Sequence, residues 1–232
     1  AATEPGAAPW CSPGKAPVTS PCGIFSGGYQ SRGRDMRELP PVAPSHRETW
    51  EAGSAVRVGL SIIANHGGGW AYRLCPTSSD LSEECFQAGH LPFDGDKQWL
   101  VDTNGRIVAT MPAVRLSEGT TPAGSSWARN PVPMELTGGA KATSAPYPTP
   151  PAPFAVGRGP FNFSVVDQLR VPKELAPGEY TLSWRWEAEQ TKQVWAQCSD
   201  VLVTAPGAAA AAPPPTAAAR ALATSRPVCV GG

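Results

Sequence analysis

The sequence has few charged residues and no long apolar run, and both absences exclude classes of function. Only 16% of the residues are charged, and 19 Lys and Arg balance 19 Asp and Glu. A chain without net positive charge has no long-range field that would attract nucleic acid or an anionic membrane surface. No apolar stretch is long enough to cross a bilayer, and the Ala-rich stretch at 208–212 runs directly into prolines. We therefore expect no nucleic-acid partner and no membrane insertion.

Common catalytic and metal-binding motifs are absent as well. The chain has three histidines, His46, His66 and His90, and contains no HExxH, GxSxG, P-loop or GxGxxG pattern. Its cysteines form no CxxC pair, which argues against zinc ribbons and thioredoxin-like redox sites. Hydrolysis by paired carboxylates needs two acids on opposed loops. Nothing in the sequence brings Glu83/Glu84 and Glu187/Glu189 together, so we interpret them as solvated charges.

What the sequence has in abundance is proline and glycine, which favours short strands joined by turns. The chain carries 27 prolines and 24 glycines, more than a fifth of its 232 residues. Apolar residues alternate with polar ones over residues 55–64, 70–75, 98–111, 161–172, 180–187 and 193–205. Asn104-Gly105 predicts a type I′ hairpin, and residues 81–87 predict one helical turn. The pattern predicts an all-β fold, an antiparallel β-sandwich with long Pro/Gly-rich loops.

The alternation also predicts which side chains share a face of each strand. Trp70, Tyr72 and Leu74 should lie on one side and Ala71, Arg73 and Cys75 on the other. Trp184 and Trp186 alternate in the same way and are expected in the core. Glycines 67–69 separate the first two strands, which we expect to form either a hairpin or a bulged bend.

Three regions follow from these patterns. Residues 1–48 are irregular and predict an N-terminal arm that Trp10 and Cys11 pin to the body. Residues 49–205 predict the sandwich domain. Residues 206–232 form an Ala/Pro-rich tail typical of a semi-extended linker or stalk.

An even number of cysteines predicts disulfides and therefore an oxidising, extracellular compartment. Cys75 and Cys85 are close in sequence and are expected to pair. Cys11 and Cys22 could pair with each other, or either could reach Cys198. Cys229 lies beyond the tail, where it could fold back or bridge to another chain. Asn162-Phe163-Ser164 is a glycosylation sequon, which agrees with secretion.

Five segments together resemble a known family. They are "ANHGGGWAYRLC", "EECFQ", "NPVP", "PGEYTLSWRWEAEQT" and the ending "QVWAQCSDV". Over residues 50–204 they resemble the lytic polysaccharide monooxygenases and the related chitin-binding type-4 domains. The resemblance implies an immunoglobulin-like β-sandwich with a flat polysaccharide-binding face. It also implies a T-shaped copper site, in which two histidines and the free N-terminal amine bind the metal beside an axial aromatic residue and a Gln or Glu.

Mapped onto this chain, His66 matches the internal copper ligand, Trp195 the axial aromatic residue and Gln193 the nearby polar residue. The first ligand of the family is an N-terminal histidine, whereas residue 1 here is Ala1. If Ala1 is the native terminus, we expect no copper cofactor and no catalysis, because one imidazole alone does not hold copper tightly. If residues precede Ala1 in the mature protein, the site could be intact. From the residues alone, His66 could also be a turn histidine that bonds backbone near the glycines, and His46 and His90 are interpreted as surface polar residues.

Aromatic residues suggest a second kind of site, at which rings bind sugars. Trp70, Trp127 and Tyr147 lie in or beside predicted loops, where exposed rings could stack on sugars. An equally good interpretation of Trp127 is a loop anchor folded onto the body. The leading hypothesis is a secreted carbohydrate-binding module, or a structural module of a cell wall or matrix that contacts other chains through its tail and Cys229. The alternative is an active copper-dependent monooxygenase that cleaves a chitin-like or cellulose-like polysaccharide.

Overall fold

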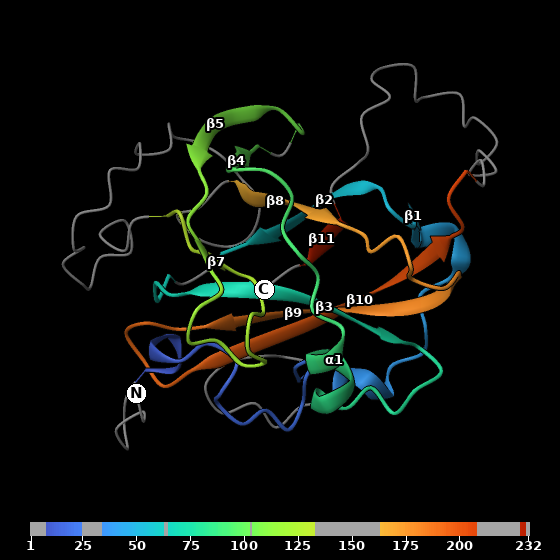
Figure 1. Cartoon of the computed structure of the whole chain (residues 1–232), viewed down its shortest axis with the longest axis horizontal. Helices are drawn as coiled ribbons and strands as arrows, with labels where there is room; N and C mark the ends of the chain where they lie inside the picture. Colours follow the sequence, from blue (N-terminus) through green and yellow to red (C-terminus); the bar gives the residue numbers. More distant parts are fainter. Residues whose placement is uncertain are drawn as a thin grey trace.

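The structure is a computed structural model, and it describes residues 8–24, 34–62, 65–102, 104–132 and 163–207, together with the backbone of 228–230. Within these residues, two β-sheets and a single short α-helix make up nearly all of the regular structure (Figure 1). No helix among them is long and apolar enough to cross a membrane.

One sheet has six strands and the other has five, and together they form a sandwich. The six-stranded sheet runs, in spatial order, β1 (Glu48–Glu51), β10 (Val194–Thr204), β9 (Gly178–Glu187), β3 (Gly69–Pro76), β7 (Trp127–Arg129) and β6 (Arg115–Leu116). The five-stranded sheet runs β11 (Val228–Val230), β2 (Ala55–Ser61), β8 (Ser164–Arg170), β4 (Lys97–Val101) and β5 (Ile107–Pro112). The predicted all-β sandwich is confirmed. The β1–β10 and β11–β2 pairs are parallel, and the other pairs are antiparallel.

The core lies between the two sheets, where their apolar faces meet. From β3 it receives Trp70, Tyr72 and Leu74, as the alternation predicts. The inward residues of β2 and β9 share one cluster with them: Val56, Val58, Leu60, Tyr180, Leu182, Trp184 and Trp186. Burying side chains of this size is the main favourable contribution to folding such a sandwich.

The predicted connection between the first two long strands is wrong. Strands β2 and β3 belong to different sheets, so they do not pair as a hairpin. Alternation alone cannot reveal this, because a strand buried on one face reads the same in either sheet.

The predicted hairpin at Asn104-Gly105 exists, since β4 and β5 pair antiparallel on either side of it. Its turn is not a two-residue type I′ turn over Asn104 and Gly105, because the Gly105 N–H donates to the Asp102 carbonyl at 2.9 Å and thus closes the turn one residue earlier. Asp102 also accepts hydrogen bonds through Oδ1 from the backbone N–H groups of Asn104 and Arg106.

The outer face of the six-stranded sheet is covered by the N-terminal arm and by α1 (Glu83–Ala88), which Figure 1 shows beneath β9 and β3. The helix begins at Ser82, whose hydroxyl accepts a hydrogen bond from the Cys85 N–H. Trp10 is buried against Trp127 and Ala71, so it does pin the arm to the body. Cys11 is exposed and does not contribute to that contact.

Candidate functional site

The segment around His66 is fixed by a buried pair of asparagines, Asn65 and Asn130. Asn65 is 2% exposed, and its side-chain N–H donates to the Val132 carbonyl at 2.9 Å. Its Oδ1 accepts hydrogen bonds from the Gly67 N–H and from Asn130, both at 2.9 Å. Gly67 and Gly68 have φ values of +65° and +71°, which explains why glycines stand there.

His66 itself is half-buried and is held from two sides. Its carbonyl accepts hydrogen bonds from the N–H groups of Glu189 (3.0 Å) and Gln190 (3.2 Å) in the turn between β9 and β10. Its imidazole stacks on Trp186, with ring centroids 6.3 Å apart and an interplanar angle of 29°. The Trp186 indole N–H donates to the Gly67 carbonyl at 2.8 Å, which fixes the ring beneath His66. Burial lowers the pKa of His66, which favours the neutral imidazole.

Trp195 lies next to the same tryptophan. Trp195 of β10 is the register partner of Trp186 of β9, and paired residues of antiparallel strands point to the same face. Trp195 is half-buried, packs against the core, and has a buried indole N–H without a partner. Gln193 precedes it by two residues, accepts from Thr191 Oγ1 at 2.8 Å through its side chain, and through its carbonyl accepts from the Ala188 N–H. The structure thus brings His66, Trp195 and Gln193 to one end of the sandwich, around Trp186.

An ion pair at this end was not found from the sequence. Arg129 Nη2 donates to both carboxylate oxygens of Glu189, at 3.0 and 2.9 Å, and Glu189 Oε2 also accepts from the Gly68 N–H at 3.2 Å. The pair therefore holds the backbone of the His66 segment at Gly68. The acidic residue was visible in the sequence, but its basic partner lies 60 residues away, so no local pattern connects them.

The first described residues of the N-terminal arm lie beside the same strand end. The Trp10 N–H donates to the Ala188 carbonyl at 3.3 Å, one residue before Glu189. The Trp10 ring packs so closely on Gly69 that a Cβ there would lie 2.5 Å from a ring carbon. Figure 1 shows the short helical turn η1 (Pro9–Cys11) at the end of β9 and β10. Trp10 therefore contacts both Ala188, which precedes Glu189 in the turn after β9, and Gly69, at the start of β3.

The tryptophans expected to stack on sugars are not at the surface. Trp70 and Trp127 are both 0% exposed, so neither ring can meet a sugar in this structure. The indole N–H of Trp70 donates to Asp167 at 2.7 Å between the sheets. The Trp127 N–H donates to Ser125 at 3.0 Å beneath the arm, which agrees with the alternative interpretation of an anchor. Tyr147 and the sequon residue Asn162 lie outside the described residues.

Two disulfides decide between the cysteine pairings that the sequence left open. Cys75 pairs with Cys85, as predicted, and joins β3 to α1. Cys22 pairs with Cys198, which excludes the Cys11–Cys22 alternative, and Cys11 is a free, exposed thiol. The side chain of Cys229 lies outside the described residues.

Among the described residues, the other two histidines do not form a metal site with His66. His46 is an exposed residue of the short turn η3 (Pro44–His46). His90 is largely buried beside Trp127, so its interpretation as a surface residue is wrong. Within the described ranges, no group of three or more His, Cys, Asp or Glu side chains could hold a metal ion. The described residues supply a single imidazole at this end, which by itself does not make a copper site.

Comparison of the chain with protein-family models finds no match, and comparison with curated proteins finds none either. The function therefore has to be argued from the site.

Proposed function

We propose that the chain is a secreted polysaccharide-binding β-sandwich, built on a scaffold like that of the lytic polysaccharide monooxygenases, and that its binding surface is the end of the sandwich around His66. One observation carries the proposal. His66, the histidine within the most specific motif of the resemblance, is half-exposed and stacked on Trp186, with Trp195 next to it in register.

The chemistry of this end suits an uncharged polymer. A neutral imidazole, the Gln193 amide and backbone groups can exchange hydrogen bonds with sugar hydroxyls, while indole edges offer apolar contact. Arg129 and Glu189 neutralise each other, so the surface presents no unpaired charge from this pair. The two disulfides support an oxidising compartment, as expected for a protein that meets polysaccharide outside the cell.

Retention on insoluble polysaccharide tests this function. The purified chain is incubated with chitin, cellulose and cell-wall glycans, and bound protein is measured against concentration. We expect retention on one of these polymers, and for His66→Ala an affinity lower by roughly tenfold, the effect of losing about 1.4 kcal/mol of binding free energy. His46→Ala, at an exposed histidine elsewhere, is the matched control. Absence of retention on all three, or equal binding by His66→Ala, would refute the proposal.

Copper-dependent oxidation of the polysaccharide is the second candidate. It is favoured by the position of His66, Trp195 and Gln193 at one end of the sandwich, where Trp10 of the arm donates a hydrogen bond to Ala188. His66 would be a ligand of the copper, which would supply the oxidative chemistry, and the arm would lie close enough to border that site. Because the described residues hold one imidazole there, we derive no reaction step from them.

Copper binding can be measured without any assay of activity. Protein from its natural source, with its mature terminus intact, is titrated with Cu²⁺ and followed by electron paramagnetic resonance. A type-2 signal that is lost in His66→Ala would support the oxidative function. Weak binding that His66→Ala leaves unchanged would exclude it and leave the binding function in place.

A further inference from the structure

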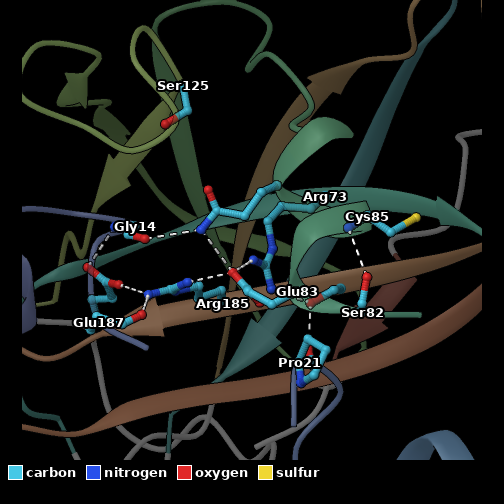
Figure 2. A network of polar contacts seen from close by, with 12 residues as sticks. Gly14, Pro21, Arg73, Ser82, Glu83, Cys85, Ser125, Arg185 and Glu187 are labelled. Atoms are coloured by element: carbon cyan, nitrogen blue, oxygen red, sulfur yellow. Dashed lines mark hydrogen bonds and ion pairs between the residues drawn. The ribbon is translucent and has the colours of Figure 1, made fainter. Parts of the chain in front are cut away.

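Four charged side chains form a buried cluster on the outer face of the six-stranded sheet. Arg73, Arg185 and Glu187 are 0% exposed, and the fourth member, Glu83 of α1, has a side chain that is 20% exposed. Glu83 Oε1 accepts hydrogen bonds from Arg73 (2.5 Å) and from Arg185 (2.6 Å). Arg185 also forms a short ion pair with Glu187, and Figure 2 shows the four residues as one connected network.

The cluster also holds the backbone of the N-terminal arm. Glu187 Oε2 accepts from the Gly14 N–H at 3.0 Å, and Arg185 Nη2 donates to the Ala16 carbonyl at 2.7 Å. On the other side of Gly14, its carbonyl accepts from Gln87 Nε2 of α1 at 3.1 Å. The arm also fits tightly here, because a Cβ at Gly14 would lie 1.8 Å from the Thr121 carbonyl oxygen.

Stability alone does not account for such a cluster. Removing two charges from water is costly, and well-packed apolar residues of similar volume often stabilise a fold equally well. The irregular arm, however, has backbone N–H and C=O groups without sheet partners, and these need partners when they are covered. Buried carboxylate and guanidinium groups provide those partners in one fixed geometry.

The same strand end that holds the arm also holds the segment around His66. Glu187 is the register partner of Gly69, and a Cβ at Gly68 would lie 1.9 Å from the Glu187 carbonyl oxygen. Two residues further on, the N–H of Glu189 donates to the His66 carbonyl. Glu187 therefore contacts the arm through its side chain and the His66 segment through its main chain.

We infer that Glu187 and Arg185 are a positioning pair, which fixes the N-terminal arm to the end of β9. Because the same end of β9 holds the His66 segment, the arm is a structural part of the His66 site. The inference deepens the proposed function, since it rests on His66 as the centre of the site. Its experimental readouts need neither polysaccharide nor copper, so either idea can fail separately.

Limited proteolysis tests the contact with the arm. Lys15 is exposed and lies between Gly14 and Ala16, the two residues that the pair holds, so trypsin cleavage after Lys15 reports release of the arm. In Glu187→Gln, Gly14 keeps an acceptor of similar shape, but Arg185 loses one of its two charge partners and keeps only Glu83. We expect cleavage after Lys15 to be faster by roughly tenfold, because cleavage follows the population of the open arm. Val58→Ala, in the core of the other sheet, controls for general loss of stability.

The imidazole of His66 gives a second, independent readout. The nuclear magnetic resonance signals of its ring protons should shift in Glu187→Gln, remain in place in Val58→Ala, and return toward the original positions in Glu187→Asp. If Glu187→Gln does not fold, Gln87→Ala, which removes the hydrogen bond to the Gly14 carbonyl, takes its place with the same expectations. Unchanged cleavage and an unchanged His66 signal, or changes equal to those of Val58→Ala, would overturn the inference.

Discussion

Asp167 accepts a hydrogen bond from the Trp70 indole at 2.7 Å in the interior of the sandwich, and both residues are 0% exposed. The carboxylate also accepts from Gln98 at 3.0 Å and from Arg115 at 2.9 Å. A buried carboxylate of this kind is tolerated because all of these donors surround it. The same contact turns Trp70 inward and makes it part of the core.

Removing this carboxylate should be among the most damaging single changes in the chain. Asp167→Ala leaves the indole of Trp70 and the guanidinium of Arg115 without their acceptor, and we expect the free energy of unfolding to fall by about 3–5 kcal/mol. Asp94→Ala, which removes a partly exposed ion pair with Arg170, should cost about 0–1 kcal/mol. Urea denaturation of the two variants compares them, and equal losses would contradict the role assigned to Asp167.

Much of the sandwich could be predicted because its strands are buried on one face. Alternation identified the inward residues of β3 and β9, and the glycine at the Asn104-Gly105 turn marked the β4–β5 hairpin. Local patterns suffice for such features, because side-chain direction repeats every second residue along a strand. The pairing of Cys75 with Cys85 was accessible for a similar reason, since only 10 residues separate them.

The wrong predictions concern side chains whose burial depends on partners that are distant in the sequence. The glycines before Trp70 favour a ring beside a loop that could stack on a sugar, whereas the structure buries the ring against Asp167, 97 positions away. The interpretation of Glu83 and Glu187 as separate, solvated charges is wrong, because both pair with Arg185 on a face of β9 that the arm covers. In the candidate site, the family resemblance pointed to His66, Trp195 and Gln193, and their role there stays a prediction. The contribution of Arg129 and of the arm required the three-dimensional arrangement.

His90 should make the protein less stable in acid. Burial, with the nearby charges of Arg73 and Arg185, lowers the pKa of His90 to about 3. The unfolded chain, with an ordinary imidazole pKa, binds this proton below pH of about 6.5, whereas the folded protein does not. The free energy of unfolding should therefore decrease as the pH falls from about 6.5 to about 3.

Replacing the titrating ring tests this effect. His90→Phe keeps a ring against Trp127 and cannot take up a proton, so its loss of stability between pH 7 and pH 4 should be smaller than that of the unaltered protein. His46→Phe, at an exposed site, should leave that pH dependence unchanged. Thermal unfolding at several pH values measures both, and parallel curves for His90→Phe and the unaltered chain would contradict the prediction.

The two disulfides should differ in how much they stabilise the fold. Cys22–Cys198 spans 176 residues and Cys75–Cys85 spans 10, and a longer closed loop removes more entropy from the unfolded chain. We expect the double variant Cys22→Ala/Cys198→Ala to lose about 5 kcal/mol, and Cys75→Ala/Cys85→Ala about 3 kcal/mol. Denaturant unfolding of the two double variants gives the comparison, and a larger loss for the short loop would show that packing around the bridge, not loop length, dominates.

Asp35 also contributes to the free energy of unfolding, and acid removes this contribution at a lower pH than the contribution of His90. Its carboxylate accepts hydrogen bonds from Arg37 at 2.7 and 2.9 Å, and this contact lowers the pKa of Asp35 to about 2. Because the folded pKa lies below that of the unfolded chain, the contribution is complete above pH of about 4 and is lost as the pH falls through about 2. Asp35→Asn should therefore cost on the order of 1–2 kcal/mol at pH 7 and little near pH 2.

Denaturation of Asp35→Asn and of the unaltered chain at both pH values measures this difference. Glu38→Gln, which alters an exposed pair with Arg34, serves as the control. A cost that is the same at both pH values would mean that Asp35 acts through its shape in the turn and not through its charge.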